Sequence, residues 1–413
     1  MCSTVGGRRR VRRALVVIAV VTYALVGTGM AAGAAKGDTP TRCTNGTRVA
    51  SGGDDVCIAR GNAMATQLLD AVREVDRSKP IQGLVFGVWI DGKQVLTGAM
   101  GQQVAGVPTT RAVHFRLGNT AETMMTTLLL RLVDQGKIKL DDPVAKWYPN
   151  LPESGQVTVR MLASSTSGYP DYATTDEFNT RLHANPFEPW TPDELLAIAM
   201  KQPPVFAPGT SWAFSDTNFM LLGQILQRAS GRPYPELVKA QILDKVGLRD
   251  TSFPTTSAIP DPVLHSYTNE RGVYEEATYW SPSDFPNNGS VVTTLGDLGK
   301  WTTALGTGAL LSKKSFDLQT GRQNVGLGPL TANRYYGMGV VHVNGWIFTN
   351  PQFDGYTGVL GYLPAKKATV AVASTFGPKG DITVSYGAAV FNRIAEILSP
   401  ENAPNLTVCP RGC

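Results

Sequence analysis

The sequence predicts an α/β protein of the α+β type. One antiparallel sheet is built from both ends of the chain and covered by helices, and the middle third forms a helical, loop-rich second lobe. Strand-like runs flank a turn at 83–100 and return late, at 336–374, with amphipathic helical patterns between them. With 413 residues, 42% of them hydrophobic and 17% charged, the chain can bury a large core. The functional pocket is expected between the two lobes.

The N-terminal segment has the order of an export signal. Five arginines precede an uncharged apolar run at 14–27, and small residues follow as far as Ala35. We predict that residues 1–35 are a cleaved signal peptide and that the protein is exported. The alternative is an uncleaved N-terminal anchor, because residues 14–35 are long enough to span a bilayer. A membrane is therefore expected as a partner only through this segment.

The positive charge of the chain comes from the same segment. The formal net charge is +5, and residues 1–35 contain five arginines and no acidic residue. Without that segment the net charge is zero, so we expect no nucleic-acid partner.

Four cysteines remain after the predicted signal, and an even number in an exported chain suggests two disulfides. They are Cys43, Cys57, Cys409 and Cys413. Pairing by proximity gives Cys43 with Cys57 and Cys409 with Cys413, although three connectivities are possible. No spacing fits a zinc site and the four histidines are scattered, so we expect no metal and no cofactor.

Three further segments follow the predicted signal. Residues 36–61 are polar and rich in glycine, which predicts an extension in front of the main domain. The main domain is expected at 62–398, followed by a C-terminal tail at 399–413. The chain contains no internal repeat and no low-complexity tract.

The first elements of the main domain are a helix and a hairpin. A helix is predicted from Asn62 to Lys79, where Pro80 stops it, and its apolar face comprises Met64, Leu68, Leu69 and Val72. Two strands, 83–90 and 93–100, then flank Asp91-Gly92, a pair typical of a tight hairpin turn.

The next helix is predicted to be buried and to begin near Asn119. Apolar residues recur at helical spacing, and Gly136 has the position of a residue that ends a helix. Asn119, followed three residues later by Glu122, matches a capping box. A second amphipathic helix runs from Asn218 to Gly231. The late strands are 336–343, 346–349 and 368–374, and a last helix at about 382–398 closes the core.

Seven short runs then occur in a recognisable order. They are Phe115–Gly118, Gly136–Pro143, Thr166–Gly168, Pro208–Ser215 with Asn218, Val246–Thr251, Asn288–Thr294 with Asp297 and Leu298, and Gly355–Gly358. In this order they resemble the serine β-lactamase and penicillin-binding-protein superfamily, and most of all its class C-like esterase and D-peptidase branch. The resemblance covers about 62–398 and implies the β-lactamase/transpeptidase-like fold.

The resemblance also implies three catalytic motifs. Ser-x-x-Lys, which supplies the nucleophile and a lysine that helps to deprotonate it, falls on Asn119 and Glu122. Tyr-x-Asn, a proton shuttle and substrate contact, falls on Phe214 and Asp216. His- or Lys-(Ser/Thr)-Gly, on an edge strand, begins at Tyr356. The residues expected to line the pocket beside these positions are Ser215, Thr357 and Gly358.

All three motifs have lost their reactive groups. The amide of Asn119 cannot be activated by loss of a proton near neutral pH, Glu122 reverses the charge of the lysine, and Phe214 cannot transfer a proton. We therefore predict that the family's acyl-transfer route is absent. The structural interpretation of Asn119 and Glu122 is a helix cap.

Other hydroxyls could in principle replace the nucleophile. Thr120, Ser164, Ser165 and Ser215 lie near the motifs, but each is more typical of a cap or turn. Glu122 and Asp216 could converge, which would suit acid/base hydrolysis or a cationic ligand. We favour the simpler interpretation, in which they stay apart.

Two hypotheses for function follow. The first is an exported, catalytically inactive family member that binds a small molecule or a protein in the cleft between the lobes. The second is an active hydrolase of an ester, amide or peptidoglycan-type bond with rearranged catalytic groups. A purely structural role would show no ligand.

Overall fold

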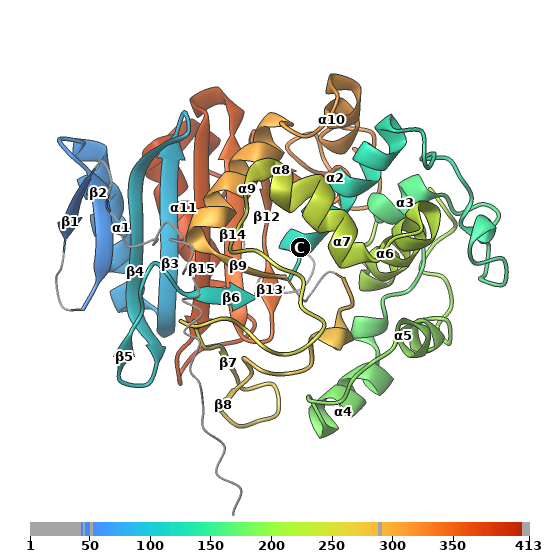
Figure 1. The fold of residues 1–413 in the computed structure, drawn as a ribbon, viewed down its shortest axis with the longest axis horizontal. Helices are drawn as coiled ribbons and strands as arrows, with labels where there is room; N and C mark the ends of the chain where they lie inside the picture. The colour runs from blue at the N-terminus through green and yellow to red at the C-terminus, as the bar shows by residue number, and fades with distance from the viewer. Residues whose placement is uncertain (1–42, 44–45, 50–52, 117, 288–290, 407–413) are drawn as a thin grey trace, which may run out of the picture. The chain divides into compact units, whose positions relative to one another are not determined.

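An antiparallel sheet organises the fold, with strand order β1-β2-β4-β3-β15-β14-β12-β11-β10 (Figure 1). The computed structural model describes residues 43, 46–49, 53–116, 118–287 and 291–406. The main strands are β1 (Gly46–Val49), β2 (Asp55–Ala59), β3 (Ile81–Ile90), β4 (Lys93–Val104), β10 (Arg334–Tyr336), β11 (Val341–Val343), β12 (Trp346–Thr349), β14 (Tyr356–Leu363) and β15 (Ala368–Phe376). Two short strands, β5 (Val107–Pro108) and β13 (Gln352–Phe353), pair with β4 and β14.

The two ends of the chain meet at the centre of this sheet. Strand β3 pairs antiparallel with β15, with Val85 opposite Ala373. The predicted hairpin joins β3 to β4, and both turn residues, Asp91 and Gly92, have positive φ (49° and 72°). A tight hairpin turn of this kind favours Asp-Gly because both central residues need positive φ. The prediction of a sheet made from both termini is confirmed.

Helices cover the two faces of the sheet separately. On one face lie α1 (Ala63–Ser78) and α11 (Tyr386–Leu398), which pack on each other. Helix α11 also packs on β14 and β15, and α1 packs on β4 and β2. On the other face lies α9 (Leu295–Thr307), against β3, β14 and β15. The predicted α1 face is buried at Leu68, Leu69 and Val72, whereas Met64 is exposed.

The second lobe is helical, as predicted. Its helices are α2 (Thr120–Asp134), α3 (Val159–Ala163), α4 (Asp176–Ala184), α5 (Pro192–Ala199), α6 (Asp216–Ser230), α7 (Tyr234–Val238), α8 (Asp244–Val246) and α10 (Lys313–Gln319). Glycines with positive φ end two of them, Gly136 after α2 and Gly231 after α6 (both 70°).

Short elements complete the fold. Two small antiparallel sheets pair β6 (His114–Arg116) with β9 (Val292–Thr294) and β7 (Tyr267–Thr268) with β8 (Glu275–Glu276). Single turns of 3₁₀ helix are η1 (Val144–Lys146), η2 (Tyr172–Thr174), η4 (Pro282–Asp284), η5 (Pro364–Lys366) and η6 (Pro400–Asn402), and η3 (Lys239–Leu243) is a π turn.

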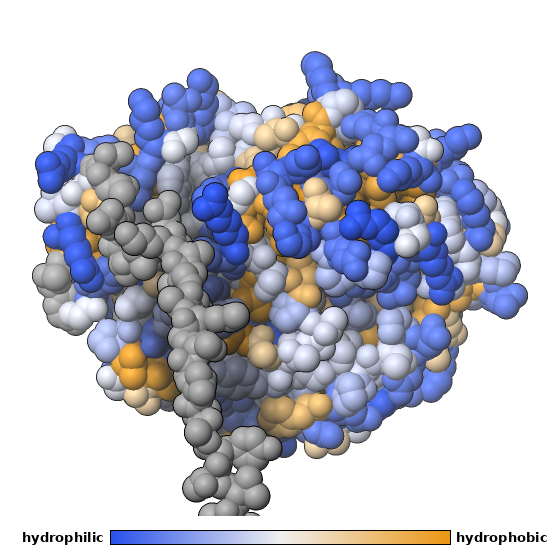
Figure 2. All heavy atoms as spheres, in the orientation of Figure 1, coloured by the Kyte–Doolittle hydropathy of each residue, from blue (hydrophilic) through white to orange (hydrophobic). Residues whose placement is uncertain are grey.

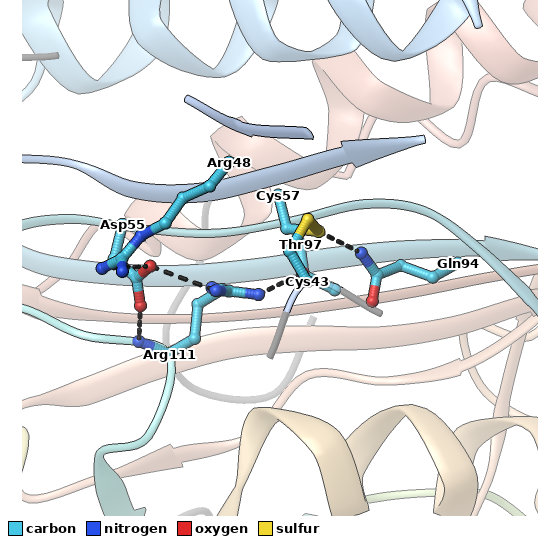
Figure 3. Close-up of a disulfide and its surroundings, with 7 residues drawn as sticks. All are labelled: Cys43, Arg48, Asp55, Cys57, Gln94, Thr97 and Arg111. Atoms are coloured by element: carbon cyan, nitrogen blue, oxygen red, sulfur yellow. Dashed lines mark hydrogen bonds and ion pairs between the residues drawn. A yellow bond between two sulfur atoms is a disulfide. The ribbon is translucent and has the colours of Figure 1, made fainter. Parts of the chain in front are cut away.

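The segment predicted as a polar extension contributes strands β1 and β2 to the sheet. Strand β2 pairs with β4, and the predicted Cys43–Cys57 disulfide is present (Figure 3). Beside it, the buried Asp55 carboxylate forms ion pairs with Arg48 (3.3 Å) and Arg111 (3.1 Å). The predicted signal, Cys409 and Cys413 lie outside the described residues. Within the described part of the chain, no helix is both long and apolar enough to cross a membrane.

Candidate functional site

The first motif position lies at the start of α2, between the sheet and the helical lobe. Glu122 is buried (3% exposed) and Asn119 half-buried. Asn119 Nδ2 donates a hydrogen bond to Glu122 Oε1 (3.2 Å). The two side chains that the sequence resemblance assigns to the family's nucleophile and lysine positions are therefore bound to each other.

The predicted capping box is wrong. Asn119 has helical backbone angles (φ −57°, ψ −8°), and its side chain makes no capping bond. The first turn already includes the carbonyl of Gly118, which accepts from the Ala121 amide (2.9 Å). A capping side chain needs an extended backbone at its own residue, and Asn119 lies inside the turn. Its amide therefore reaches the side chain of Glu122 instead of a backbone N–H.

The second motif position precedes α6. The Phe214 ring stacks on Phe219 with centroids 5.9 Å apart, so the aromatic side chain at the family's tyrosine position serves packing. Ser215 is buried (2% exposed) with an extended backbone at the start of α6 and makes no capping bond. Asp216 is buried in the first turn of that helix (8% exposed).

Glu122 and Asp216 lie near the same two buried tyrosines. The pKa of the Tyr336 hydroxyl is well above its ordinary value, first because of burial and then because of the negative charge of Glu122 and, to a smaller extent, Asp216. The pKa of Tyr172 is raised by burial, Asp216 and, more weakly, Glu122. Both carboxylates thus act on the same two hydroxyls. Their convergence at one site stays a prediction.

The third motif position is the beginning of β14, where Tyr356, Thr357 and Gly358 are buried. The Tyr356 hydroxyl donates to the carbonyl oxygen of Leu264 (2.6 Å). Successive side chains of a strand point to opposite faces. Tyr356 belongs to the core beside the helical lobe, while Thr357 lies within hydrogen-bond distance of Ser374 Oγ (3.0 Å) and accepts from the Gly387 amide of α11. Thr357 thus lies on the α11 face and does not line the predicted cleft.

The hydroxyls considered as replacement nucleophiles are all buried. Thr120 and Ser165 are 0% exposed, Ser215 2% and Ser164 3%. Ser164 donates to the carbonyl of Arg160 (2.9 Å), as expected for a turn residue. Ser165 has a positive φ of 56° in the same turn. None of these hydroxyls is presented to a substrate approaching from solvent.

A short strand beside the third motif position was also missed from the sequence. The short strand β13 pairs with the beginning of β14, joined to it by a two-residue turn at Asp354-Gly355 with φ of 38° and 85°. The sequence does contain a predictor of this hairpin, because Asp354-Gly355 is the same dipeptide that forms the turn of the first hairpin. The strand itself is only two residues long, too short for a recognisable alternation.

Metal chemistry has no obvious site in the described ranges. Across those ranges, no group of three or more His, Cys, Asp or Glu side chains is placed to hold a metal ion.

A surface groove of about 510 Å³ lies against the loop before Tyr172, lined among others by Asp171, Asp176 and Val205. Figure 2 shows that, in the orientation of Figure 1, hydrophilic residues cover much of the visible surface, with hydrophobic residues in smaller areas.

The helical lobe and the antiparallel sheet made from both ends of the chain define the β-lactamase/transpeptidase-like class of proteins. The chain belongs to the Beta-lactamase family, whose pattern matches residues 68–389. The predicted superfamily and fold are thereby confirmed.

Relatives in this family carry hydrolase names. The chain is 29% identical over 195 residues to the D-alanyl-D-alanine-carboxypeptidase/endopeptidase AmpH of Escherichia coli (45% of this chain, 47% of AmpH). It is 29% identical over 217 residues to Esterase EstB of Burkholderia gladioli (46% and 53%). The chain thus spans about half the length of these curated relatives.

A solved structure shows the same fold over nearly its whole length. It is a D-stereospecific amidohydrolase from a Streptomyces species, with a TM-score of 0.70 and 27% sequence identity. The alignment covers 82% of this chain and 98% of that one.

Proposed function

We propose that this protein is an exported, non-catalytic member of the Beta-lactamase family that binds a small molecule or a protein in the cleft between its lobes. The observation that carries the proposal is the hydrogen bond from Asn119 Nδ2 to Glu122 Oε1 (3.2 Å). These two residues occupy the positions where the family places its nucleophile and lysine. An amide bound to a carboxylate cannot attack a carbonyl carbon, and neither group can act as a nucleophile by the family route.

The surroundings of these residues support the same conclusion. Phe214 has no hydroxyl to transfer a proton and packs against Phe219. The neighbouring hydroxyls of Thr120, Ser165 and Ser215 are at most 2% exposed. Loss of one member of a cooperating catalytic set costs nearly as much as loss of the whole set. With all three motifs altered, the protein lacks the nucleophile, the base and the proton-transfer group that the family reaction requires.

Export is the second part of the proposal. The N-terminal arginines, apolar run and small residues have the order of a signal peptide. The Cys43–Cys57 disulfide is consistent with an oxidising compartment, where such bonds persist. The names of the relatives, a carboxypeptidase/endopeptidase and an esterase, favour a small molecule or peptide of the cell envelope as the bound species.

The test is covalent labelling of the purified protein. We expect no labelling by a fluorophosphonate probe and no turnover of a chromogenic cephalosporin or of short-chain aryl esters. Labelling that is lost on substitution of Thr120, Ser165 or Ser215 by alanine would overturn the proposal and establish an active hydrolase with rearranged groups. The Streptomyces amidohydrolase, purified in parallel, serves as the positive control for probe quality.

A further inference from the structure

The surface groove of about 510 Å³ lies outside the three motif positions and has an acidic lining. It is formed by residues 170–177 and by residues 202–205. Three of its described lining residues are carboxylates and none is basic, while the second segment is largely apolar. The carboxylates are Asp171, Asp176 and Glu177, and the apolar residues of the second segment are Pro203, Pro204 and Val205.

Hydrogen bonds hold both segments of the groove in place. The carbonyl oxygen of Pro170 accepts from the Thr217 hydroxyl of α6 (2.7 Å). The amide of Val205 donates to the carbonyl oxygen of Gly168 (2.9 Å). Gly168 has a positive φ of 80°, and a Cβ atom there would lie 2.0 Å from the carbonyl oxygen of Phe206. The two segments therefore approach each other closely through a glycine, and backbone contacts of the fold set the shape of the groove.

The part of the chain that contains the groove is acidic. Residues 170–205 carry six acidic and two basic side chains, a net charge of −4, whereas the chain after residue 35 has no net charge. Both basic side chains already have acidic partners within the segment. Arg181 forms an ion pair with Glu188 (2.7 Å). Lys201 Nζ donates to both carboxylate oxygens of Glu177 (2.7 Å). The segment therefore leaves an excess of negative charge at this surface.

Asp176 is the carboxylate of the groove that is most available to a ligand. It is exposed, in the first turn of α4, and forms no ion pair with a basic side chain of the described residues. Asp171, by contrast, accepts a hydrogen bond from the Ala173 amide (3.0 Å). Val205 lines the same groove and is 60% exposed. The groove thus combines a carboxylate that lacks a basic partner with an exposed apolar side chain.

Negative charge is also present next to the groove, toward the cleft between the lobes. Asp171 directly precedes Tyr172, whose hydroxyl is buried and donates to the carbonyl oxygen of Asp284 (2.8 Å). After burial, the pKa of Tyr172 is raised by the charges of four carboxylates, which are Asp216, Asp171, Asp284 and Glu122. A ligand that approaches this side of the helical lobe therefore meets a negative potential, which attracts positive charge.

The lining fits an organic cation better than a metal ion. In the described part of the chain, no three His, Cys, Asp or Glu side chains are placed to hold a metal. Lysine and arginine side chains place a charged head against carboxylates while their aliphatic stems cover apolar surface. The two prolines, Pro203 and Pro204, have no backbone N–H, so their carbonyl groups present only acceptors to a ligand. A groove of about 510 Å³ is large enough for more than one side chain.

We propose that the groove formed by residues 170–177 and 202–205 is a docking site for a basic peptide segment of a partner protein. A lysine or arginine of that segment pairs with Asp176, and its aliphatic stem covers Val205. The site goes beyond the proposed function, because it lies outside the three motif positions and does not require a ligand in the cleft.

Two variants of the full chain test the site, each with a matched control. Asp176→Asn removes the carboxylate, and Asp70→Asn removes the same charge from an exposed position of α1, outside the groove. Val205→Ser removes the apolar side chain, and Val273→Ser makes the same change at a valine that is equally exposed (59%) and lies outside the groove. All four positions are exposed, so the variants are expected to fold like the parent protein.

Fluorescence anisotropy of a labelled peptide, Gly-Lys-Leu-Lys-Gly, at low ionic strength measures docking. We expect binding to the parent protein, binding about fivefold weaker to Asp176→Asn and to Val205→Ser, and no change in the two controls. Added salt should weaken binding, because the pairing charges are exposed. The acidic peptide Gly-Glu-Leu-Glu-Gly should not bind.

Several results would overturn the proposal. They are no binding of the lysine peptide, equal binding of the acidic peptide, and the same loss of affinity in a variant and its matched control. Competition separates a peptide site from a site for simple cations. Unlabelled lysine peptide should displace the labelled one, whereas Mg²⁺ and spermidine at the same ionic strength should not. Displacement by Mg²⁺ or by spermidine as effective as that by the peptide would show a site for small cations and would also overturn the proposal.

Discussion

Asn119 Nδ2 lies 3.2 Å from Glu122 Oε1, so the amide at the family's nucleophile position donates to a carboxylate at its lysine position. In the family pattern these two positions cooperate to make a reactive oxygen. Here they cooperate to satisfy each other in a largely buried place. The exchange keeps the first turn of α2 polar and ordered while removing both reactive groups.

This contact predicts a strong effect of Asn119→Asp. The substitution replaces an N–H donor by a second carboxylate oxygen beside Glu122. We expect the free energy of unfolding at pH 7 to fall by about 2 kcal/mol or more, because two like charges are then held close together away from water. The loss should shrink as the pH falls toward about 4, where one carboxylate takes up a proton. Urea denaturation from pH 4 to 8 measures both.

Asn62→Asp is the matched control for that substitution. The Asn62 side chain caps α1 and accepts from the Ala65 amide (3.3 Å). Aspartate accepts the same bond and suits the positive end of the helix, so stability at pH 7 should stay equal or rise. A similar loss in both variants would contradict the role assigned to Asn119.

Restoring the family residues should restore some chemistry. The variant with Asn119→Ser, Glu122→Lys, Phe214→Tyr and Asp216→Asn regains most of the first two motifs. We expect weak hydrolysis of aryl esters, because the backbone at the start of α2 and α6 is unchanged. The rate is measured against the same variant with alanine at 119. A folded variant without activity would mean that the groups no longer meet across the cleft.

Turns and helix ends were predicted correctly from the sequence because the backbone angles of one or two residues determine them. Asp91-Gly92 specifies a tight turn through its own positive φ angles, and Gly136 ends α2 in the same way. The seven short runs in family order also predicted the superfamily correctly. These features depend on a few adjacent residues.

The remaining features depend on contacts between distant segments. Asn119 resembles a cap in the sequence, but its backbone is helical and its side chain makes no capping bond. The shared surroundings of Glu122 and Asp216 depend on Tyr336, which comes from the far end of the chain. Strand β13 forms only because β14 is beside it. Sequence patterns that involve only neighbouring residues cannot predict such long-range contacts.

Asp76 on α1 predicts a pH effect on stability. Burial and the nearby charge of Asp54 raise its pKa from the ordinary 3.8 to about 6, against a smaller opposing effect of Arg77. The unfolded chain therefore ionises this group more readily, and the folded state loses stability as the pH rises from about 4 through 6. Asp76→Asn removes that loss.

We expect Asp76→Asn to raise the free energy of unfolding by about 1 to 2 kcal/mol at pH 7.5, after allowance for screening of a partly exposed group. The difference should disappear at pH 3.5, where the aspartate is protonated in both states. Asp70→Asn, at an exposed position of the same helix, is the control and should show neither effect. Equal stabilisation at both pH values would contradict this explanation.

The buried pair of Asp55 and Arg111 predicts the opposite pH dependence. Both side chains are at most 5% exposed, and Arg111 donates to Asp55 through its side chain (3.1 Å) and its backbone amide (3.1 Å). Burial alone would raise the pKa of Asp55, but these bonds and the charges of Arg111 and Arg48 lower it below 3.8. The stabilisation is therefore present above pH 3.8 and is lost as the pH falls below it.

Asp55→Asn should consequently lower the free energy of unfolding at pH 7 by about 3 kcal/mol, since it removes the charge that faces a buried guanidinium. The control is Asp91→Asn, in an exposed pair with Lys367 at 3.3 Å (65% and 67% exposed). Exposed pairs contribute about 0 to 1 kcal/mol, and asparagine suits the turn at that position, so little change is expected there. Thermal and urea denaturation of the two variants measure the difference. Comparable losses in both would show that burial does not distinguish the two pairs, and that β2 is held to the sheet by its backbone pairing with β4.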